Sequence, residues 1–153
     1  MRSALFADLE ENIMAEFLGV ALQTVEENDN VLFTEDVFCS GRGITRRPGS
    51  GIVRVSGNGS QGRARYLVAF SGNIQIPAGG TVGEISVAIS VDGEALASTE
   101  MIVTPAAVEN FFNVSAQAYI DVPCGCCVTI AVENTSDQAI EVQNANLIVV
   151  RTA

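Results

Sequence analysis

The sequence contains no histidine, no tryptophan and no lysine, so all eight of its basic residues are arginines. Histidine is the commonest general base in enzymes, and its absence excludes every catalytic triad that depends on it. Carboxylates are plentiful, but the sequence alone does not allow any pair of them to be placed at the separation that a glycosidase requires. We therefore predict a protein that is not an enzyme.

Positive charge is scarce as well, because 8 arginines stand against 18 acidic residues and give a formal net charge of −10. Nucleic-acid binding needs a basic surface, so the sequence predicts no nucleic-acid partner. No apolar run approaches the roughly 20 residues that cross a bilayer, and we expect no membrane contact. The first 17 residues carry acids where a secretory signal would be uninterruptedly apolar, so we expect no signal peptide.

Helical periodicity is confined to the start of the chain. Leu5, Leu9, Ile13 and Phe17 follow one another at intervals of four and would line one side of a short helix. Such a helix is marginal alone in water, so we predict a docking helix or arm that packs on another subunit. With the first strand it makes up residues 1–29, and a head domain follows over residues 30–153.

The chain after about residue 17 alternates between apolar and polar residues with the period of a β-strand. Asp92-Gly93 suits a tight type I′ turn, and Asn58-Gly59 offers a second one. Short strands without intervening helices predict an all-β antiparallel sandwich or barrel. The predicted strands cover roughly residues 17–25, 31–39, 51–56, 63–72, 84–91, 95–103, 109–121, 126–133 and 139–151.

Two of these strands are apolar on both faces. Phe111 and Tyr119 lie opposite the predicted core face of 109–121, and the last strand has Leu147 and Val149 on one face with Ile148 on the other. An antiparallel sandwich strand normally exposes one face to water. A second copy of the chain would cover both faces, and a strand buried locally under a loop is the alternative.

Several segments together resemble a known family: "ARYLVAFSGNIQIP" with its Tyr-x-Val-x-Phe pattern, the hairpin "ISVAISVDGEAL", "VTIAVEN" and the closing "NANLIVVRTA". Residues 30–153 resemble the jelly-roll head shared by tumour necrosis factor and the complement-type globular domains. The bacterial and phage versions, which cap collagen-like spore-surface glycoproteins and occur in phage structural proteins, are the most similar. No Gly-X-Y repeat precedes the head, which departs from the stalked spore proteins.

The resemblance implies a ten-stranded antiparallel jelly roll that forms a tight homotrimer. Phe111, Tyr119, Leu147 and Val149 would then pack around the threefold axis. It also implies a non-enzymatic structural protein of a phage virion, a capsid decoration protein or a fibre head. Such a protein would be assembled in the bacterial cytoplasm and would bind other virion proteins such as the major capsid protein. The alternative is an adhesin or ligand-binding head on the surface of a bacterial cell or spore.

Arg42, Arg46 and Arg47 cluster in the Gly/Pro-rich segment "GRGITRRPGSG". They would either form a solvated loop that neutralises neighbouring acids or bind an anionic partner. Glu35 and Asp36 offer carboxylate oxygens to calcium, with a solvated turn as the alternative. We predict no cofactor and no metal site.

Three of the four cysteines, Cys124, Cys126 and Cys127, lie in the segment "PCGCC". A structural zinc site needs about four ligands, and a redox Cys-x-x-Cys pair is expected after a βαβ unit that this sequence lacks. We therefore interpret the segment as the start of a strand with Cys126 in the core. A disulfide between Cys39 and one of the three stays open. The glycosylation sequons at 58, 113 and 134 are interpreted as chance matches.

Overall fold

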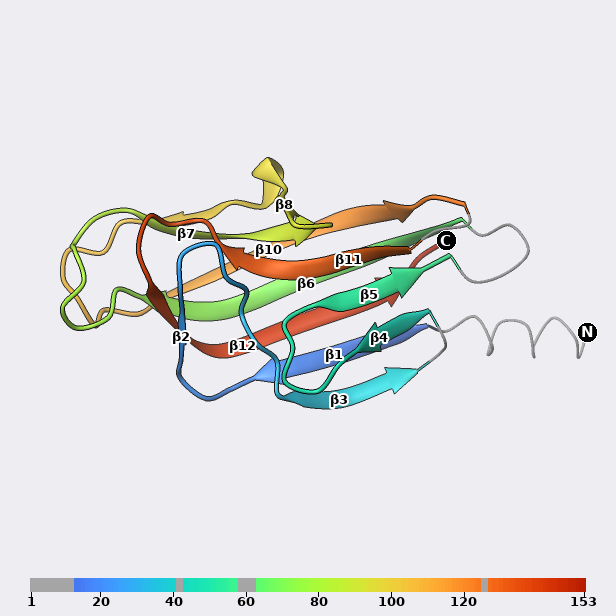
Figure 1. Ribbon diagram of the computed structural model, residues 1–153, viewed down its shortest axis with the longest axis horizontal. Coiled ribbons are helices and arrows are strands. Elements are labelled where there is room, and N and C mark those ends of the chain that lie inside the picture. The colour runs from blue at the N-terminus through green and yellow to red at the C-terminus, as the bar shows by residue number, and fades with distance from the viewer. Residues whose placement is uncertain (1–12, 41–42, 58–62, 125–126) are drawn as a thin grey trace, which may run out of the picture.

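Twelve strands and one short 3₁₀ turn, η1 (Ala97–Thr99), make up the computed structural model, which describes residues 13–40, 43–57, 63–124 and 127–153. The strands run along the long axis of the molecule (Figure 1). They are β1 (Met14–Gly19), β2 (Gln23–Val25), β3 (Glu35–Ser40), β4 (Ile44–Arg46), β5 (Val53–Ser56), β6 (Ala64–Gln75), β7 (Ile85–Val91), β8 (Glu94–Ala95), β9 (Met101–Val103), β10 (Phe112–Val122), β11 (Cys127–Asn134) and β12 (Ile140–Arg151).

The strands form two antiparallel sheets that pack face to face. The first, called sheet A, has the order β10-β6-β12-β1-β3, with β2 also paired to β12. The second, called sheet B, has the order β4-β5-β11-β7-β8, with β9 also paired to β7. The predicted all-β antiparallel sandwich is confirmed. No helix within the described ranges is long and apolar enough to span a membrane.

The strand number exceeds the ten that the resemblance implies, because β4 lies in none of the nine predicted ranges and two of those ranges each contain two strands. The prediction over residues 17–25 covers parts of both β1 and β2. The prediction over residues 95–103 is broken by η1, so that β8 and β9 pair separately with β7. Short strand pieces of this kind follow local twists of a sandwich edge and leave the layer architecture unchanged.

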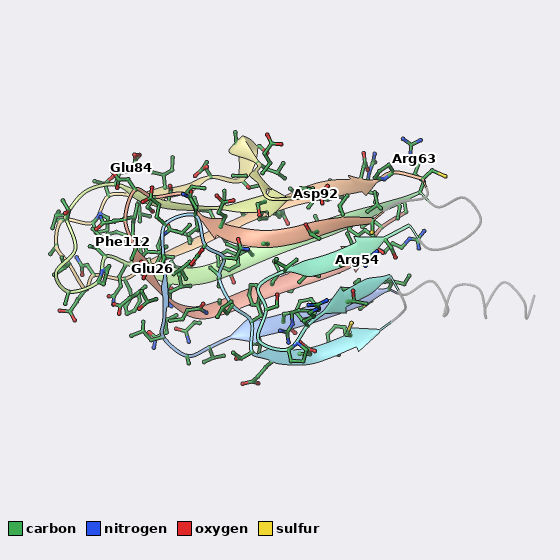
Figure 2. All side chains as sticks on the ribbon, viewed as in Figure 1. Glu26, Arg54, Arg63, Glu84, Asp92 and Phe112 are labelled. Atoms are coloured by element: carbon green, nitrogen blue, oxygen red, sulfur yellow. The ribbon has the colours of Figure 1, made fainter. Side chains whose placement is uncertain are left out.

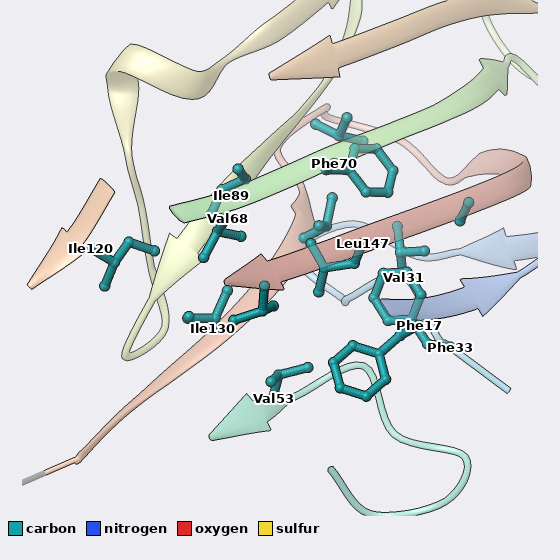
Figure 3. Packing of buried hydrophobic residues seen from close by; sticks show 14 of the residues in the cluster. Phe17, Val31, Phe33, Val53, Val68, Phe70, Ile89, Ile120, Ile130 and Leu147 are labelled. Carbon is teal, nitrogen blue, oxygen red and sulfur yellow. The ribbon is translucent and has the colours of Figure 1, made fainter. Parts of the chain in front are cut away.

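The core lies between the sheets and is built from one face of each strand. Tyr66, Val68 and Phe70 of β6 alternate with outward residues and are at most 2% exposed. Figure 3 shows Val68 and Phe70 packed among Phe17, Ile89 and Leu147, which come from both sheets. The Tyr66 hydroxyl donates to the backbone carbonyl of Ser56 on sheet B at 2.8 Å, so the polar atom carried into the core has a partner.

The hairpin between β7 and β8 turns at Asp92-Gly93. Both residues have positive φ, 52° and 86° respectively, and Val91 pairs with Glu94 across the two-residue loop. This is the backbone conformation that a type I′ turn requires, and Gly93 adopts it without steric cost. The prediction is confirmed here, whereas the turn predicted at residues 58–59 lies outside the described residues.

The N-terminal segment enters the sandwich as a strand. β1 lies between β12 and β3, and β2 also pairs with β12, so residues 14–25 belong to sheet A and form no separate arm. Ile13 and Phe17, predicted on a docking helix, are buried in the core at 4% and 1% exposure. The helix prediction is wrong for these two residues, because every second position from 13 to 19 is buried and the strand period fits as well as the helical one. Leu5 and Leu9 lie outside the described residues.

A β-bulge in β12 decides which of its side chains face the core. The pairing with β6 shifts between Gln143 and Asn146, and Asn144 adopts a φ of 59°. One extra residue reverses the faces of everything that follows in the strand. Leu147 and Val149 are therefore fully buried inside the chain, and their prediction as outward interface residues is wrong.

Candidate subunit interface

The outer face of sheet A carries an apolar row across four strands. Tyr119 of β10 pairs with Leu67 of β6, Leu67 with Val150 of β12, and Val150 with Met14 of β1. Tyr119 is 66% exposed, and the other three are half-buried. An apolar row of this length over a sheet face is a feature of protein interaction sites.

A second row lies beside the first and is mixed. Ala69 pairs with Ile148, Ile148 with Glu16, and Glu16 with Phe38 of β3. Ile148 is 39% and Phe38 43% exposed. The Glu16 carboxylate accepts a hydrogen bond from the Asn146 side-chain amide at 2.6 Å, so the charge in this row has a partner within the chain.

The centre of the face is hollowed. An open hollow of about 510 Å³ lies over β10, β6 and β12, where small side chains point outward. Its outward lining is Ala69, Ser71, Ser115, Gln117, Asn146 and Ile148. Small residues between larger apolar ones produce the relief that a complementary protein surface fills.

Beyond the hollow the face becomes polar. Asn73 donates its amide to Asn144 and accepts from Asn113, with N–O distances of 3.0 Å in both bonds. Gln75 is buried and donates to Glu141 at 2.8 Å. The face is thus divided along the strands into an apolar half and an amide-rich half.

An exposed ion pair borders the apolar half. The Arg65 guanidinium contacts Asp121 with an N–O distance of 2.7 Å, and both side chains are more than half exposed. The hydrogen bond from Arg65 lowers the pKa of the Asp121 carboxyl. A solvated pair of this kind adds little to stability, and interface rims commonly contain such exposed polar groups.

The structure exposes a different set of apolar residues from the one that the sequence predicts for an interface. Tyr119 lies on the apolar row, as expected for an outward residue. Phe111 is 42% exposed just before β10 begins, about 26 Å along the strand from Tyr119 at 3.3 Å per residue. Sequence reasoning missed Leu67, Ala69 and Phe38. Leu67 and Ala69 are two successive apolar residues on the outward side of β6, whereas Phe38 lies between the polar alternate positions Asp36 and Ser40 of β3.

The arginine cluster is only partly available to a partner. The Arg46 side chain is 3% exposed and forms an ion pair with Asp36, and its guanidinium lies 5.3 Å from the centre of the Phe17 ring. This corrects the prediction of Arg46 as an anion-binding residue, because its donors are already used inside the chain. Arg47 is exposed, and Arg42 lies outside the described residues.

Two of the glycosylation sequons lie in the described residues. Asn134 is fully buried, so its sequon is inaccessible to glycosylation, whereas Asn113 lies on the outer face of sheet A. No group of three or more acidic or cysteine side chains that could hold a metal ion occurs in the described parts of the chain. Cys126 lies outside those parts, so its predicted place in the core stays a prediction.

Comparison with solved structures identifies the fold. Murine APRIL superposes with a TM-score of 0.65 at 15% identity, covering 92% of this chain and 99% of that one. Eiger TNF from S. frugiperda gives 0.68 at 15% identity, with 94% of each chain covered. This is the tumour necrosis factor jelly roll. The globular domain of the zebrafish complement 1qA protein shares it, with a TM-score of 0.61 and 9% identity over 92% of this chain and 95% of that one.

The sequence itself carries no comparable signal. No protein-family profile matches it, and no curated protein sequence matches it. At identities of 9–15% the jelly-roll likeness establishes the fold alone. The function must therefore be argued from the surface of this chain.

The bulge in β12 predicts that substitutions at two neighbouring residues change the free energy of unfolding by very different amounts. Leu147→Ala should lower the free energy of unfolding by about 3 kcal/mol, because it leaves a cavity in the core. Ile148→Ala should change it by less than about 1 kcal/mol, because Ile148 is on the outer face. Urea denaturation of both variants, at one low protein concentration, measures the difference. Equal losses would contradict the placement of the two side chains.

Proposed function

We propose that this protein is a non-enzymatic structural head that assembles as a homotrimer through the outer face of sheet A. The observation that carries the proposal is the apolar half of that face, where Tyr119 is 66% and Ile148 39% exposed. Burying such side chains contributes about 25 cal/mol to the free energy of association for each Å² of apolar surface that is removed from water. In a monomer this surface would stay exposed to solvent.

Another copy of the chain is the partner that best fits this face. Closed symmetric assemblies of identical chains are the commonest oligomers, and each copy supplies the same apolar row to its neighbours. The jelly-roll fold of the tumour necrosis factor and complement domains supports three copies, since the sequence resemblance implies a trimer. The ion pair of Arg65 and Asp121 would lie at the solvated rim.

We further propose that the trimer is a component of a phage virion, either a capsid decoration protein or a fibre head. The support is the resemblance of the "ARYLVAFSGNIQIP" and "NANLIVVRTA" segments to the bacterial and phage versions of the fold. In this role the rigid sandwich presents loops, and other virion proteins such as the major capsid protein provide the docking surface.

A ligand-binding head on a bacterial cell or spore is the weaker candidate. The argument for this candidate was the arginine cluster, but Arg46 forms an ion pair with Asp36 of the same chain. An enzyme is weaker still, since the whole sequence lacks histidine. A pocket of about 500 Å³ between residues 81–86 and 135–138 has a polar lining. Its Thr135 hydroxyl donates to the Glu100 carboxylate at 2.8 Å, and this one contact is weak support for catalysis.

One substitution should dissociate the trimer without unfolding the chain. Ile148→Arg introduces a charge at the centre of the face that assembly would bury, which we expect to weaken association by several kcal/mol. Light scattering should then change from a particle of three times 16.1 kDa to a single chain, with an unchanged β-sheet circular dichroism spectrum.

Ile102→Arg is the matched control, because Ile102 is 55% exposed on β9 of sheet B. It should leave the trimer intact. A native protein that is monomeric at micromolar concentration would refute the proposed assembly, as would equal dissociation of the two variants.

The location is tested separately. Phage particles purified from an induced culture of the encoding strain should contain peptides of this chain at a ratio fixed to the major capsid protein. Detection in the washed cell-surface or spore-coat fraction, with none in the particles, would favour the alternative location and refute the virion role.

A further inference from the structure

The β6–β7 and β11–β12 connections form the two walls of a pocket at one end of the sandwich. Residues 81–84 and 86 line one wall, residues 135–138 line the other, and the volume between them is about 500 Å³. Small-molecule sites commonly have volumes of about 300–1,000 Å³. Both walls belong to the same chain, so the pocket does not depend on the number of subunits.

Hydrogen bonds inside the chain hold the two walls together. The Gln138 side chain accepts from the backbone N–H of Thr81 at 3.0 Å and donates to the Thr81 carbonyl oxygen at 2.7 Å. The Ser136 hydroxyl accepts from the backbone N–H of Ser86 at 2.8 Å and donates to the Ser86 carbonyl oxygen at 3.0 Å. Each pair of bonds joins one wall to the other, so the pocket is formed before a ligand arrives and binding orders little of the chain.

A chain of hydroxyl groups leads from the pocket to a carboxylate. The Thr135 hydroxyl donates to the Glu100 carboxylate at 2.8 Å, and the hydroxyl oxygens of Thr135 and Ser86 lie 2.7 Å apart. A hydroxyl has a single hydrogen, so Thr135 accepts the hydrogen bond of Ser86. The Ser86 oxygen therefore offers its lone pairs to a donor in the pocket, and the carboxylate at the end of the chain strengthens it as an acceptor.

Two further carboxylates stand on opposite walls. Glu84 and Asp137 both line the pocket and are exposed. Within the described parts of the chain, neither side chain forms a hydrogen bond or an ion pair. Figure 2 shows Glu84 in the half of the molecule away from Arg54 and Arg63. The pocket therefore has negative charge on both walls that no nearby guanidinium neutralises, which favours a positively charged ligand.

The negative field continues behind the wall that contains Thr135. Glu133 pairs with Ala88, and Glu100 directly precedes Met101 on the other side of the same strand, β7. Burial, and after it the nearby Glu100 carboxylate, raise the pKa of the Glu133 carboxyl. Carboxylates gathered in this way repel one another, and a cation bound close to them relieves the repulsion.

We propose that this pocket binds a small aliphatic diamine through its two primary ammonium groups. One ammonium pairs with Glu84 and the other with Asp137, and the Ser86 oxygen accepts a further hydrogen bond from one of them. A compact metal ion fits less well, because no three acidic or cysteine side chains of the described chain converge on one point. A diamine instead places one charge at each wall.

The test uses the full-length protein labelled with nitrogen-15, and 1,4-diaminobutane as the probe in about 0.1 M salt, which screens distant surface charges. We expect saturable chemical-shift changes at the backbone amides of Gly83, Thr135 and Asp137, with a dissociation constant of about 1 mM. The neutral analogue butane-1,4-diol should cause no shift, and butylamine, with one ammonium, should bind about threefold more weakly or worse. Shifts of the same amides by an equal concentration of Mg²⁺, or shifts that do not saturate, would show general attraction of cations and overturn the proposal.

Substitutions that remove one charge or one acceptor assign the residues. Glu84→Gln and Asp137→Asn should each weaken binding of 1,4-diaminobutane about fivefold, and the double variant should weaken it at least about tenfold. Ser86→Ala should weaken it about threefold, because one acceptor is lost. Glu94→Gln is the matched control, since Glu94 is exposed on β8 and does not line the pocket. Equal weakening by the control, or unchanged binding in the double variant, would contradict the assigned site.

Discussion

Replacing Asn134 with aspartate should lower the free energy of unfolding by about 4 kcal/mol, because it removes the donors of a buried amide. Asn134 is fully buried at the end of β11. Its side-chain nitrogen lies 3.0 Å from the carbonyl oxygen of Val25, 3.2 Å from that of Glu26 and 2.9 Å from that of Gln138. Its side-chain oxygen accepts from the backbone N–H of Ser136 at 2.9 Å. A carboxylate of the same shape would face three carbonyl oxygens.

The pH dependence separates this cause from simple loss of packing. Burial among acceptors raises the pKa of the new carboxyl in the folded state above its unfolded value. The folded state then binds the proton more tightly, so the loss of stability should shrink at low pH and grow as pH rises through the folded pKa. Asn134→Ala should show a loss without this trend.

The matched control is Asn110→Asp, the same chemical change at an exposed position just before β10. It should change the free energy of unfolding by no more than about 0.5 kcal/mol. Urea denaturation at a single protein concentration is the measurement, because association stabilises the folded chain by mass action. A loss below about 1 kcal/mol for Asn134→Asp would show that the buried amide does not hold the segment after β2 to β11.

Replacing Arg46 with methionine should lower the free energy of unfolding by about 3 kcal/mol, because it leaves several hydrogen-bond acceptors without donors. The Arg46 guanidinium donates from Nε to Asp36 at 3.0 Å and from Nη1 to the carbonyl oxygens of Phe33 and Ser50. It also lies over the Phe17 ring, where a cation is attracted to the π face. Methionine keeps the apolar contact but loses every hydrogen bond.

Two variants calibrate the Arg46 result in the same denaturation assay. Arg46→Lys should recover less than half of the loss, because an ammonium cannot reproduce the planar fork of a guanidinium. Arg47→Met, at the exposed neighbouring position, should stay within about 0.5 kcal/mol of the native chain. If Arg46→Met and Arg47→Met are equally mild, the arginine is a solvated loop residue and its contacts are not stabilising.

The sequence was most informative about the fold where a strand has one buried face and one solvent-exposed face. The Tyr-x-Val-x-Phe pattern occupies alternate positions of β6, and its residues Tyr66, Val68 and Phe70 are all buried. The Asp92-Gly93 dipeptide predicts its own turn, since few other pairs adopt positive φ at both positions. These are local rules, and they hold wherever pairing partners do not override them.

The candidate interface was predicted less well because it depends on neighbours that are distant in sequence. Tyr119 is outward as predicted, but the residues that flank it come from β6, β12 and β1. Arg46 resembles a loop cation in the sequence, and only the approach of β3 and β1 gives it Asp36 and Phe17 as partners. No local pattern contains that information.

By itself the sequence determined the strand period, the β7–β8 turn and the absence of histidine chemistry, because each depends on residues adjacent in the chain or on composition. The tertiary structure decided two things that alternation leaves ambiguous. Pairing with β12 and β3 made residues 14–19 a strand, and the bulge at Asn144 turned Leu147 inward and Ile148 outward. Side chains of a strand alternate strictly, so a single inserted residue reverses both faces, and only the pairing partner fixes where that residue is.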